Sequence, residues 1–276
     1  MYEKKIEAAH PGLVVMVLDD SGSMADALPG TTDAKFQWVE RYTGIILKEL
    51  LARSTVPVDD TTFRVKPRYY TAFVVYGARP VRWPVGATDV RDIETSVRDF
   101  AAADPTSGAA NTLGLGGRLG GTDALAAFEM AHGIVEQALQ GERFRDSFPP
   151  IVFHLSDGMS QSDAEPVAQR MATLETSDGG VLVVNALIGT TTSLAYTDPN
   201  DFPGYTTDQE AGPDPDSRRM FRMSSASPDT ISDNLRSDGI FPSLRDGARL
   251  YFDVRTKEML KHVIGTVGSG GSRANR

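Results

Sequence analysis

Three groups of oxygen-bearing side chains, far apart in the sequence, could together hold a hard metal ion. Asp19, Ser21 and Ser23 stand at alternate positions of one short segment, Thr122 follows two glycines, and Asp157 precedes a glycine. Carboxylate and hydroxyl oxygens are the donors that Mg²⁺ prefers, and Mn²⁺ accepts the same donors. These five residues form a candidate metal site, with Mg²⁺ or Mn²⁺ as the expected ion.

Nucleophilic catalysis has weaker support in the sequence. Ser21 lacks the Gly-x-Ser-x-Gly elbow of serine hydrolases, and Asp19 is followed two positions later by serine rather than by the second aspartate of an aspartyl phosphatase. His154 lies inside an apolar run, which is typical of a hydrogen-bonded core histidine. Residues 114–119 lack the third glycine of a dinucleotide-binding loop. We therefore expect a non-enzymatic protein, with a metal-dependent phosphohydrolase and a scaffold with an incidental metal as alternatives.

Apolar and β-branched runs predict the strands that must position these residues. Buried strands are expected at residues 13–18, 69–77, 151–156, 181–188 and 249–254, with a short edge strand at 80–85. Prolines at both ends of the last segment favour a sheet edge. Because two of the candidate groups directly follow strands, they would meet at one sheet edge if those strands are neighbours.

Helical spacing of apolar residues predicts the connecting elements. The expected helices are 36–53, 90–100, 122–139 with Gly141 after its end, 163–176, 229–236 and 256–267. Residues 101–121 read as a glycine-rich loop and residues 190–216 as a polar loop insertion. Strands that alternate with helices favour an α/β sandwich around a mostly parallel sheet.

Composition excludes several classes of function. The chain has 276 residues, no cysteine and a formal net charge of −9, which argues against disulfides, thiolate metal sites and nucleic-acid binding. It contains no signal-peptide pattern and no run of about 18 apolar residues, so we expect no membrane span and a cytoplasmic location. We expect one domain over residues 1–267 and a flexible tail over 268–276.

The candidate site resembles the metal-ion-dependent adhesion site (MIDAS) of von Willebrand factor A (VWA) domains. The resemblance implies a three-layer, doubly wound Rossmann-like fold with one antiparallel edge strand and helices on both faces. It implies direct metal contacts from Ser21, Ser23 and Thr122 and mainly water-mediated contacts from Asp19 and Asp157. Asp123 departs from the proline that many members carry there, and could place an extra carboxylate near the ion.

Weaker motifs resemble a bacterial standalone subgroup of VWA proteins of the tellurite-resistance-associated type. They lie at residues 177–185, 220–225 and 263–267. This resemblance implies a signalling or stress-response role beside a Ser/Thr kinase and a metal-dependent protein phosphatase. The expected partner is a protein that presents an Asp or Glu to the metal. For residues 218–223, we expect a segment packed on the core, with a partner-contact surface as the alternative.

Overall fold

The chain folds around one mixed sheet. A computed structural model describes residues 2–28, 31–84, 90–102, 113–117, 119–189 and 201–254. The sheet order is β11-β10-β7-β1-β4-β5, and β6 pairs with β4 beside β5. The strands are β1 (Gly12–Asp19), β4 (Tyr69–Tyr76), β5 (Pro80–Trp83), β6 (Arg91–Asp92), β7 (Ile151–Ser156), β10 (Leu182–Ile188) and β11 (Tyr251–Val254).

The central strands are parallel and buried on both faces. β1 pairs in parallel with β4 on one side and with β7 on the other. Its side chains alternate, so that Leu13, Val15 and Val17 join one core cluster while Val14 and Met16 join the other. This two-sided burial explains why the strand reads as a continuous apolar run in the sequence.

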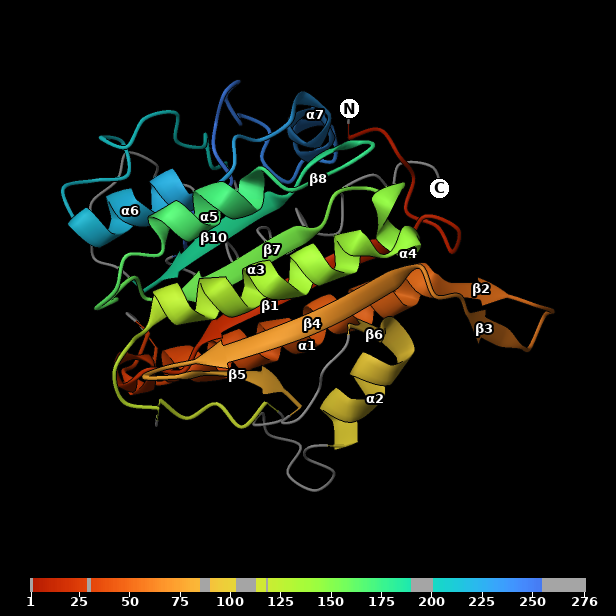
Figure 1. Cartoon of the computed structure of the whole chain (residues 1–276), viewed down its shortest axis with the longest axis horizontal. Helices are drawn as coiled ribbons and strands as arrows, with labels where there is room; N and C mark the ends of the chain where they lie inside the picture. Colours follow the sequence, from red (N-terminus) through yellow and green to blue (C-terminus); the bar gives the residue numbers. More distant parts are fainter. Residues whose placement is uncertain are drawn as a thin grey trace.

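Helices cover both faces of the sheet (Figure 1). On one face lie α1 (Lys35–Ser54), α2 (Ile93–Ala102) and α7 (Asp229–Ser237). On the other face lie α3 (Ala124–Gln140) and α5 (Glu165–Ala172). The antiparallel pairing of β5 with β4 forms the sheet edge. The predicted three-layer α/β class, mostly parallel with an antiparallel edge and helices on both faces, is confirmed.

The chain connection reverses direction at β1. From β1 the chain moves to β4 on one side, and it later returns to β7 on the other side. Parallel sheets leave a crevice at such a switch point, beyond the carboxyl ends of the two strands. The two strands that precede Asp19 and Asp157 are therefore neighbours, as the sequence required for a common site.

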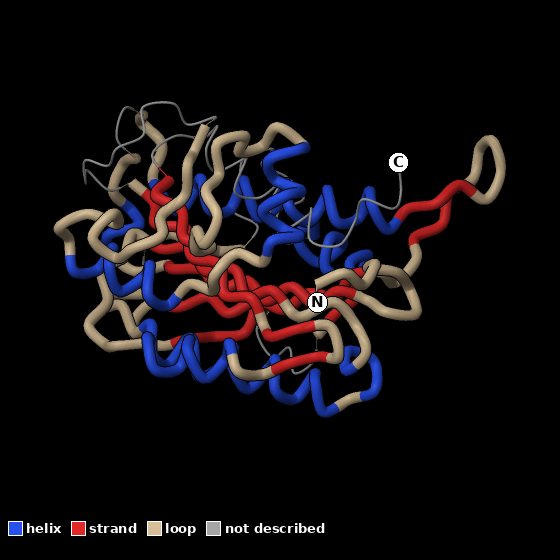
Figure 2. The backbone as a smooth tube through the Cα atoms, turned by 90° about the horizontal axis from the view of Figure 1, so that it is seen from above, coloured by secondary structure: helices blue, strands red, loops and turns tan. Residues whose placement is uncertain are grey.

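Several short elements have no counterpart in the sequence prediction. A hairpin of β2 (Thr55–Pro57) and β3 (Phe63–Val65) projects from the body of the molecule (Figure 2). A one-turn helix, α4 (Glu142–Arg145), follows α3. The predicted helix 163–176 is too long, because Glu175–Thr176 form β8, which pairs with β9 (Gly179–Gly180).

The described part of the predicted loop insertion 190–216 has no helix or strand up to residue 214, but it is packed on the protein. Residues 190–200 lie outside the described residues, but 201–214 pack against the protein, with Phe202 and Tyr205 buried in an aromatic cluster with Tyr251 and Phe252. The insertion ends in a helix, α6 (Pro215–Met223). Aromatic anchors isolated among polar residues gave no periodic signal in the sequence.

The predicted helix 256–267 and tail 268–276 lie outside the described residues. Within the part of the chain that is described, no helix has both the length and the apolarity needed to cross a bilayer.

Candidate metal centre

The carboxyl end of β1 turns directly into a one-turn 3₁₀ helix, η1 (Gly22–Ala25). One oxygen of the fully buried Asp19 carboxylate accepts from the Ser21 amide at 2.8 Å, and the other accepts from the Ser156 hydroxyl at 2.6 Å. The hydroxyl oxygens of Ser21 and Ser23 are 3.3 Å apart. Adjacent ligands of an octahedral ion, each about 2.1 Å from the metal, lie about 3.0 Å apart. The two hydroxyls are therefore spaced as a pair of metal ligands would be.

Asp157 brings a second carboxylate to this loop from the end of β7. Its Oδ2 forms an ion pair with Lys35 Nζ at 3.0 Å, and the Lys35 ammonium also donates to the Ser23 carbonyl at 3.3 Å. Its Oδ1 is buried and has no hydrogen-bond partner among the described residues. A buried carboxylate oxygen without a donor is costly, so this atom is suited to a cation or to a water bound by one.

Thr122 lies in a third loop, which is hydrogen-bonded both to the loop after β1 and to the loop after β7. The amide of Gln161, beyond β7, donates to the Thr122 carbonyl at 3.1 Å, and the Asp123 amide donates to the Gly77 carbonyl at 2.7 Å. The Gly22 amide donates to the Gly120 carbonyl at 3.0 Å, which ties the same loop to the end of β1. These backbone bonds hold a largely buried Thr122 at the common edge of the sheet.

The structure brings the five predicted residues to one edge of the sheet, four of them through mutual contacts or through Lys35, and Thr122 by a different route. Direct contacts connect Asp19 to Ser21 and Ser21 to Ser23, and Lys35 bridges Ser23 to Asp157. Thr122 is held through its own backbone, by the neighbouring loops and by the Ser160 hydroxyl, which donates to its carbonyl at 3.4 Å.

Asp123 caps a helix. Its Oδ1 accepts from the Ala126 amide at 3.1 Å, at the N-terminus of α3, and from the Ser162 hydroxyl at 2.8 Å. The first contact is that of an N-cap residue, and the second joins the start of the helix to the loop after β7. One oxygen of this carboxylate serves the helix and the loop after β7, which favours a structural role, and the expectation of an extra carboxylate beside the ion stays a prediction.

Asp20 organises the glycine-rich loop, a role that the sequence analysis missed. Its buried Oδ1 accepts from the amides of Gly116 and Gly117 at 2.6 and 2.7 Å. Gly117 has a φ of +62°, and a Cβ there would lie 2.7 Å from the backbone nitrogen of Ala25. The position requires glycine on both counts. No local signal in the sequence marks this role, because the two glycines lie 96 and 97 positions from Asp20.

Burial controls the electrostatics of the site. Desolvation raises the pKa of Asp19 to about 6, hydrogen bonds from Ser156 and Ser21 oppose that rise, and the charge of Asp157 adds to it. Two carboxylates at one buried edge favour a cation between them, because its charge would stabilise both ionised forms. Among the described residues no three His, Cys, Asp or Glu side chains cluster as metal ligands.

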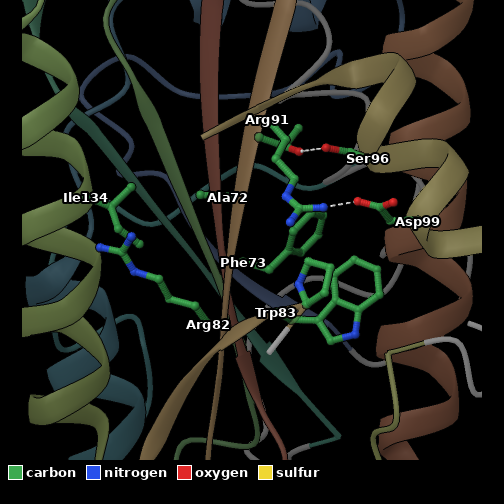
Figure 3. Close-up of a pocket in the computed structure, with 10 residues that line it drawn as sticks. Ala72, Phe73, Arg82, Trp83, Arg91, Ser96, Asp99 and Ile134 are labelled. Carbon is green, nitrogen blue, oxygen red and sulfur yellow. Dashed lines mark hydrogen bonds and ion pairs between the residues drawn. The ribbon is translucent and has the colours of Figure 1, made fainter. Parts of the chain in front are cut away.

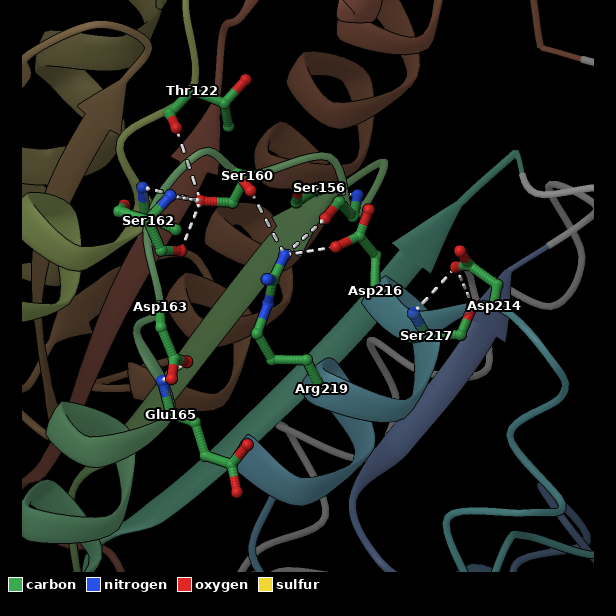
Figure 4. Close-up of polar contacts among 12 residues, drawn as sticks. Thr122, Ser156, Ser160, Ser162, Asp163, Glu165, Asp214, Asp216, Ser217 and Arg219 are labelled. Atoms are coloured by element: carbon green, nitrogen blue, oxygen red, sulfur yellow. Dashed lines mark hydrogen bonds and ion pairs between the residues drawn. The ribbon is translucent and has the colours of Figure 1, made fainter.

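Arg219 of α6 fastens the loop after Asp157 (Figure 4). Its guanidinium pairs with Asp216 and lies 3.5 Å from the carbonyl oxygens of Gly158 and Ser160. On the same helix the side chains of Met220 and Met223 are buried. The expectation that residues 218–223 pack on the core is confirmed, and the methionines do not supply a partner-contact surface.

A small pocket elsewhere in the sheet does not carry comparable chemistry (Figure 3). It lies against the middle of β4 and is lined by Phe73, Arg82, Trp83 and Arg91 among others. Arg91 is paired with Asp99 of α2, so the pocket does not present that cation to a ligand. The candidate site remains the carboxyl edge of β1 and β7.

No protein-family profile matches this sequence, and no curated protein matches it significantly. Similar solved structures include BatB from Bacteroides thetaiotaomicron, at 13% identity over 93% of this chain and 97% of that chain, with a TM-score of 0.45. Proximal thread matrix protein 1 from the mussel byssus is 14% identical over 96% of this chain and 47% of that chain, with a TM-score of 0.48. Another structure of the mussel protein, described as having a zinc-occupied MIDAS motif, is 16% identical over 66% of this chain and 36% of that chain, with a TM-score of 0.36.

Proposed function

We propose that this protein is a VWA-type interaction module that binds Mg²⁺ or Mn²⁺ and uses the ion to capture an acidic side chain of a partner protein. One observation carries the proposal. Two facing hydroxyls, Ser21 and Ser23, adjoin two buried carboxylates, and one oxygen of Asp157 has no partner among the described residues.

In this proposal Ser21, Ser23 and Thr122 contact the ion, and Asp19 and Asp157 act mainly through bound water. Neutral hydroxyl ligands leave most of the ion's charge uncompensated, so the ion keeps a strong preference for a further anionic oxygen. A carboxylate from outside the chain meets that preference. The site is therefore suited to recognition of Asp or Glu, with the surrounding loops selecting among partners.

The same geometry argues against hydrolysis at the site. A metal-dependent hydrolase needs a base that activates water, with geometry to reach the substrate. Both oxygens of Asp19 already accept hydrogen bonds from the protein. His154 is buried, and both of its ring nitrogens are hydrogen-bonded to protein side chains. We propose a non-enzymatic role on this basis.

The weaker sequence motifs suggest the setting. We propose a cytoplasmic bacterial signalling or stress-response system, with a Ser/Thr kinase or a metal-dependent phosphatase as the partner that presents the acid. The chain's acidic balance fits a protein partner better than nucleic acid.

Isothermal titration of the metal-stripped protein tests the proposal. Mg²⁺ and Mn²⁺ should bind with a stoichiometry of one, and Ser21→Ala and Asp157→Asn should each weaken binding at least about tenfold. Asp246→Asn, which removes an equal charge from a side chain that is 91% exposed, is the matched control and should bind as the wild type does.

Two results would count against the proposal. Absence of Mg²⁺ and Mn²⁺ binding would remove its basis. Hydrolysis of p-nitrophenyl phosphate that disappears in Asp157→Asn would favour the phosphohydrolase instead.

A further inference from the structure

We propose that Lys35 is a tethered cation of the metal centre, which holds Asp157 in the metal-free protein and must be displaced when a divalent ion binds. This inference rests on the proposed function and adds a residue to its site. The sequence near residue 35 does not predict a role in the metal site. The residue lies at the start of α1 and not in any of the three metal-site loops.

The position of the Lys35 ammonium carries the inference. It lies 3.0 Å from Oδ2 of Asp157 and 3.3 Å from the carbonyl oxygen of Ser23. It therefore joins the loop after β1 to the loop after β7, which are the two loops that a metal ion in this site would join. The side chain is only 12% exposed and that of Asp157 only 4%.

The backbone of Lys35 is fixed, so only its side chain need move when the ammonium is displaced. The Lys35 amide donates to the Asp26 carbonyl at 3.0 Å, and α1 begins at this residue. The four-carbon side chain has several rotatable bonds, so the ammonium can leave the site without any change in the helix. Displacement is therefore a side-chain event.

Charge makes the two cations exclusive. A divalent ion beside Asp157 and the Lys35 ammonium would repel each other over a few ångströms in a poorly solvated site, where screening by salt is weak. Other groups near Asp157 do not relieve this repulsion. The carboxylates near it are Asp19, both of whose oxygens already accept hydrogen bonds, and Asp216, which pairs with Arg219.

The inference makes opposite predictions for two properties of Lys35→Met. Without the competing ammonium, Mg²⁺ should bind at least about tenfold more tightly than to the wild type. In EDTA, the same variant should melt at a lower temperature, because Asp157 then has neither its lysine nor a metal. Lys35→Arg, which retains the charge, should stay near the wild type in both.

Lys48→Met is the matched control. Lys48 is exposed on the same helix, about 20 Å further along its axis at 1.5 Å per residue, and its loss changes the net charge equally. It should alter neither the affinity nor the melting temperature in EDTA.

The experiment is Mg²⁺ titration and thermal unfolding in EDTA for the wild type and these three variants, together with the ¹⁵N–¹H signal of the Lys35 ammonium. In the metal-free protein the protons of this ammonium should exchange slowly with water, so that the signal is visible. Addition of Mg²⁺ should free the ammonium and abolish the signal. Equal or weaker Mg²⁺ affinity in Lys35→Met, while the wild type binds, would overturn the inference and leave the proposed function intact. Binding by Lys35→Met alone would support the inference and contradict metal binding by the native protein. Absence of binding in every variant would overturn both.

Discussion

Two polar clusters are buried in the same sheet. They differ in whether all of their polar atoms have hydrogen-bond partners within the protein. The first is the candidate metal centre at the ends of β1 and β7. The second, which we call the interior line, crosses the strands from Tyr76 on β4 through His154 on β7 and Asn185 on β10 to Ser224 after α6. Both lie among apolar side chains, yet only one has an open oxygen.

Every side-chain polar atom of the interior line has a hydrogen-bond partner. The Ser224 hydroxyl donates to the Met220 carbonyl at 2.8 Å and accepts from the Asn185 amide nitrogen at 2.9 Å. The Asn185 oxygen can only accept, so the proton of the neutral imidazole lies on Nδ1 of His154, 2.7 Å away. Nε2 is then free to accept from the Tyr76 hydroxyl at 2.7 Å. The line is a closed, neutral network, and the Tyr76 hydroxyl at its end also lies close to Asp19 and Ser156 of the metal centre.

The metal centre is neither closed nor neutral. It holds two carboxylates, one of them with a buried oxygen that has no partner among the described residues, and two hydroxyls that contact each other. Burial disfavours the charged form in both clusters: it lowers the pKa of His154 to about 4 and raises that of Asp19 to about 6. A buried polar cluster that satisfies itself is structural, whereas one that leaves a charged oxygen open is suited to a ligand.

Removal of hydrogen bonds from the interior line should give the largest effect on the free energy of unfolding. Asn185→Ala removes two hydrogen bonds and leaves the Nδ1 proton of His154 buried without an acceptor. We expect a loss of about 3 kcal/mol in the free energy of unfolding, measured in urea, with the Mg²⁺ affinity unchanged.

Asn234→Ala, at a partly exposed position on α7, is the control and should cost much less. If Asn185→Ala weakened Mg²⁺ binding as strongly as Ser21→Ala, the two clusters would be one functional unit and the comparison would fail.

Protonation of His154 at low pH should destabilise the interior line as well, but by less than Asn185→Ala does. The folded protein keeps His154 neutral down to about pH 4, while the unfolded chain takes up the proton near pH 6.5. The unfolded state thus binds more protons in that interval, and stability falls as the pH falls. We expect His154 to contribute a loss of about 2 kcal/mol between pH 7 and pH 5.

His154→Gln should lack this contribution, and the difference between the two urea unfolding curves measures it. The raised pKa of Asp19 acts with the opposite sign, but in both proteins, so it cancels. A wild type and a His154→Gln variant that lose the same stability from pH 7 to pH 5 would refute the closed neutral network.

The smallest effect should separate a helix cap from a metal ligand. Asp123→Ala removes the acceptor of the Ala126 amide at the start of α3 and should cost about 1 kcal/mol in the free energy of unfolding. Because the carboxylate serves the helix, the Mg²⁺ affinity should stay within about twofold of the wild type. Asp123→Asn should recover much of the stability. A tenfold loss of Mg²⁺ affinity in either variant would place Asp123 in the metal centre after all.

Much of the fold could be predicted because its strands are buried on both faces. Continuous apolar runs located β1, β7 and β10, and Gly141 marked the end of α3. Local patterns could not locate elements held by tertiary contacts. The buried Phe202 and Tyr205 fix residues 201–214 through an aromatic cluster, and β8 interrupts a sequence that continues a helical pattern.

The candidate site was predictable where residue type alone implied chemistry. Oxygen donors after apolar strands marked Asp19, Ser21 and Asp157. The residues that support them were not, because their roles depend on partners distant in the sequence: Lys35 lies 122 positions from Asp157, and Asp20 lies 96 positions from Gly116. A lysine at a helix start carries no local sign that it neutralises a remote aspartate.

An anomalous difference map from crystals grown with Mn²⁺ tests the central claim most directly. We predict one peak about 2.2 Å from the hydroxyl oxygens of Ser21, Ser23 and Thr122, with the Lys35 ammonium moved away from Asp157. A map at saturating Mn²⁺ with no peak at this edge of the sheet, and with Lys35 still paired to Asp157, would contradict it.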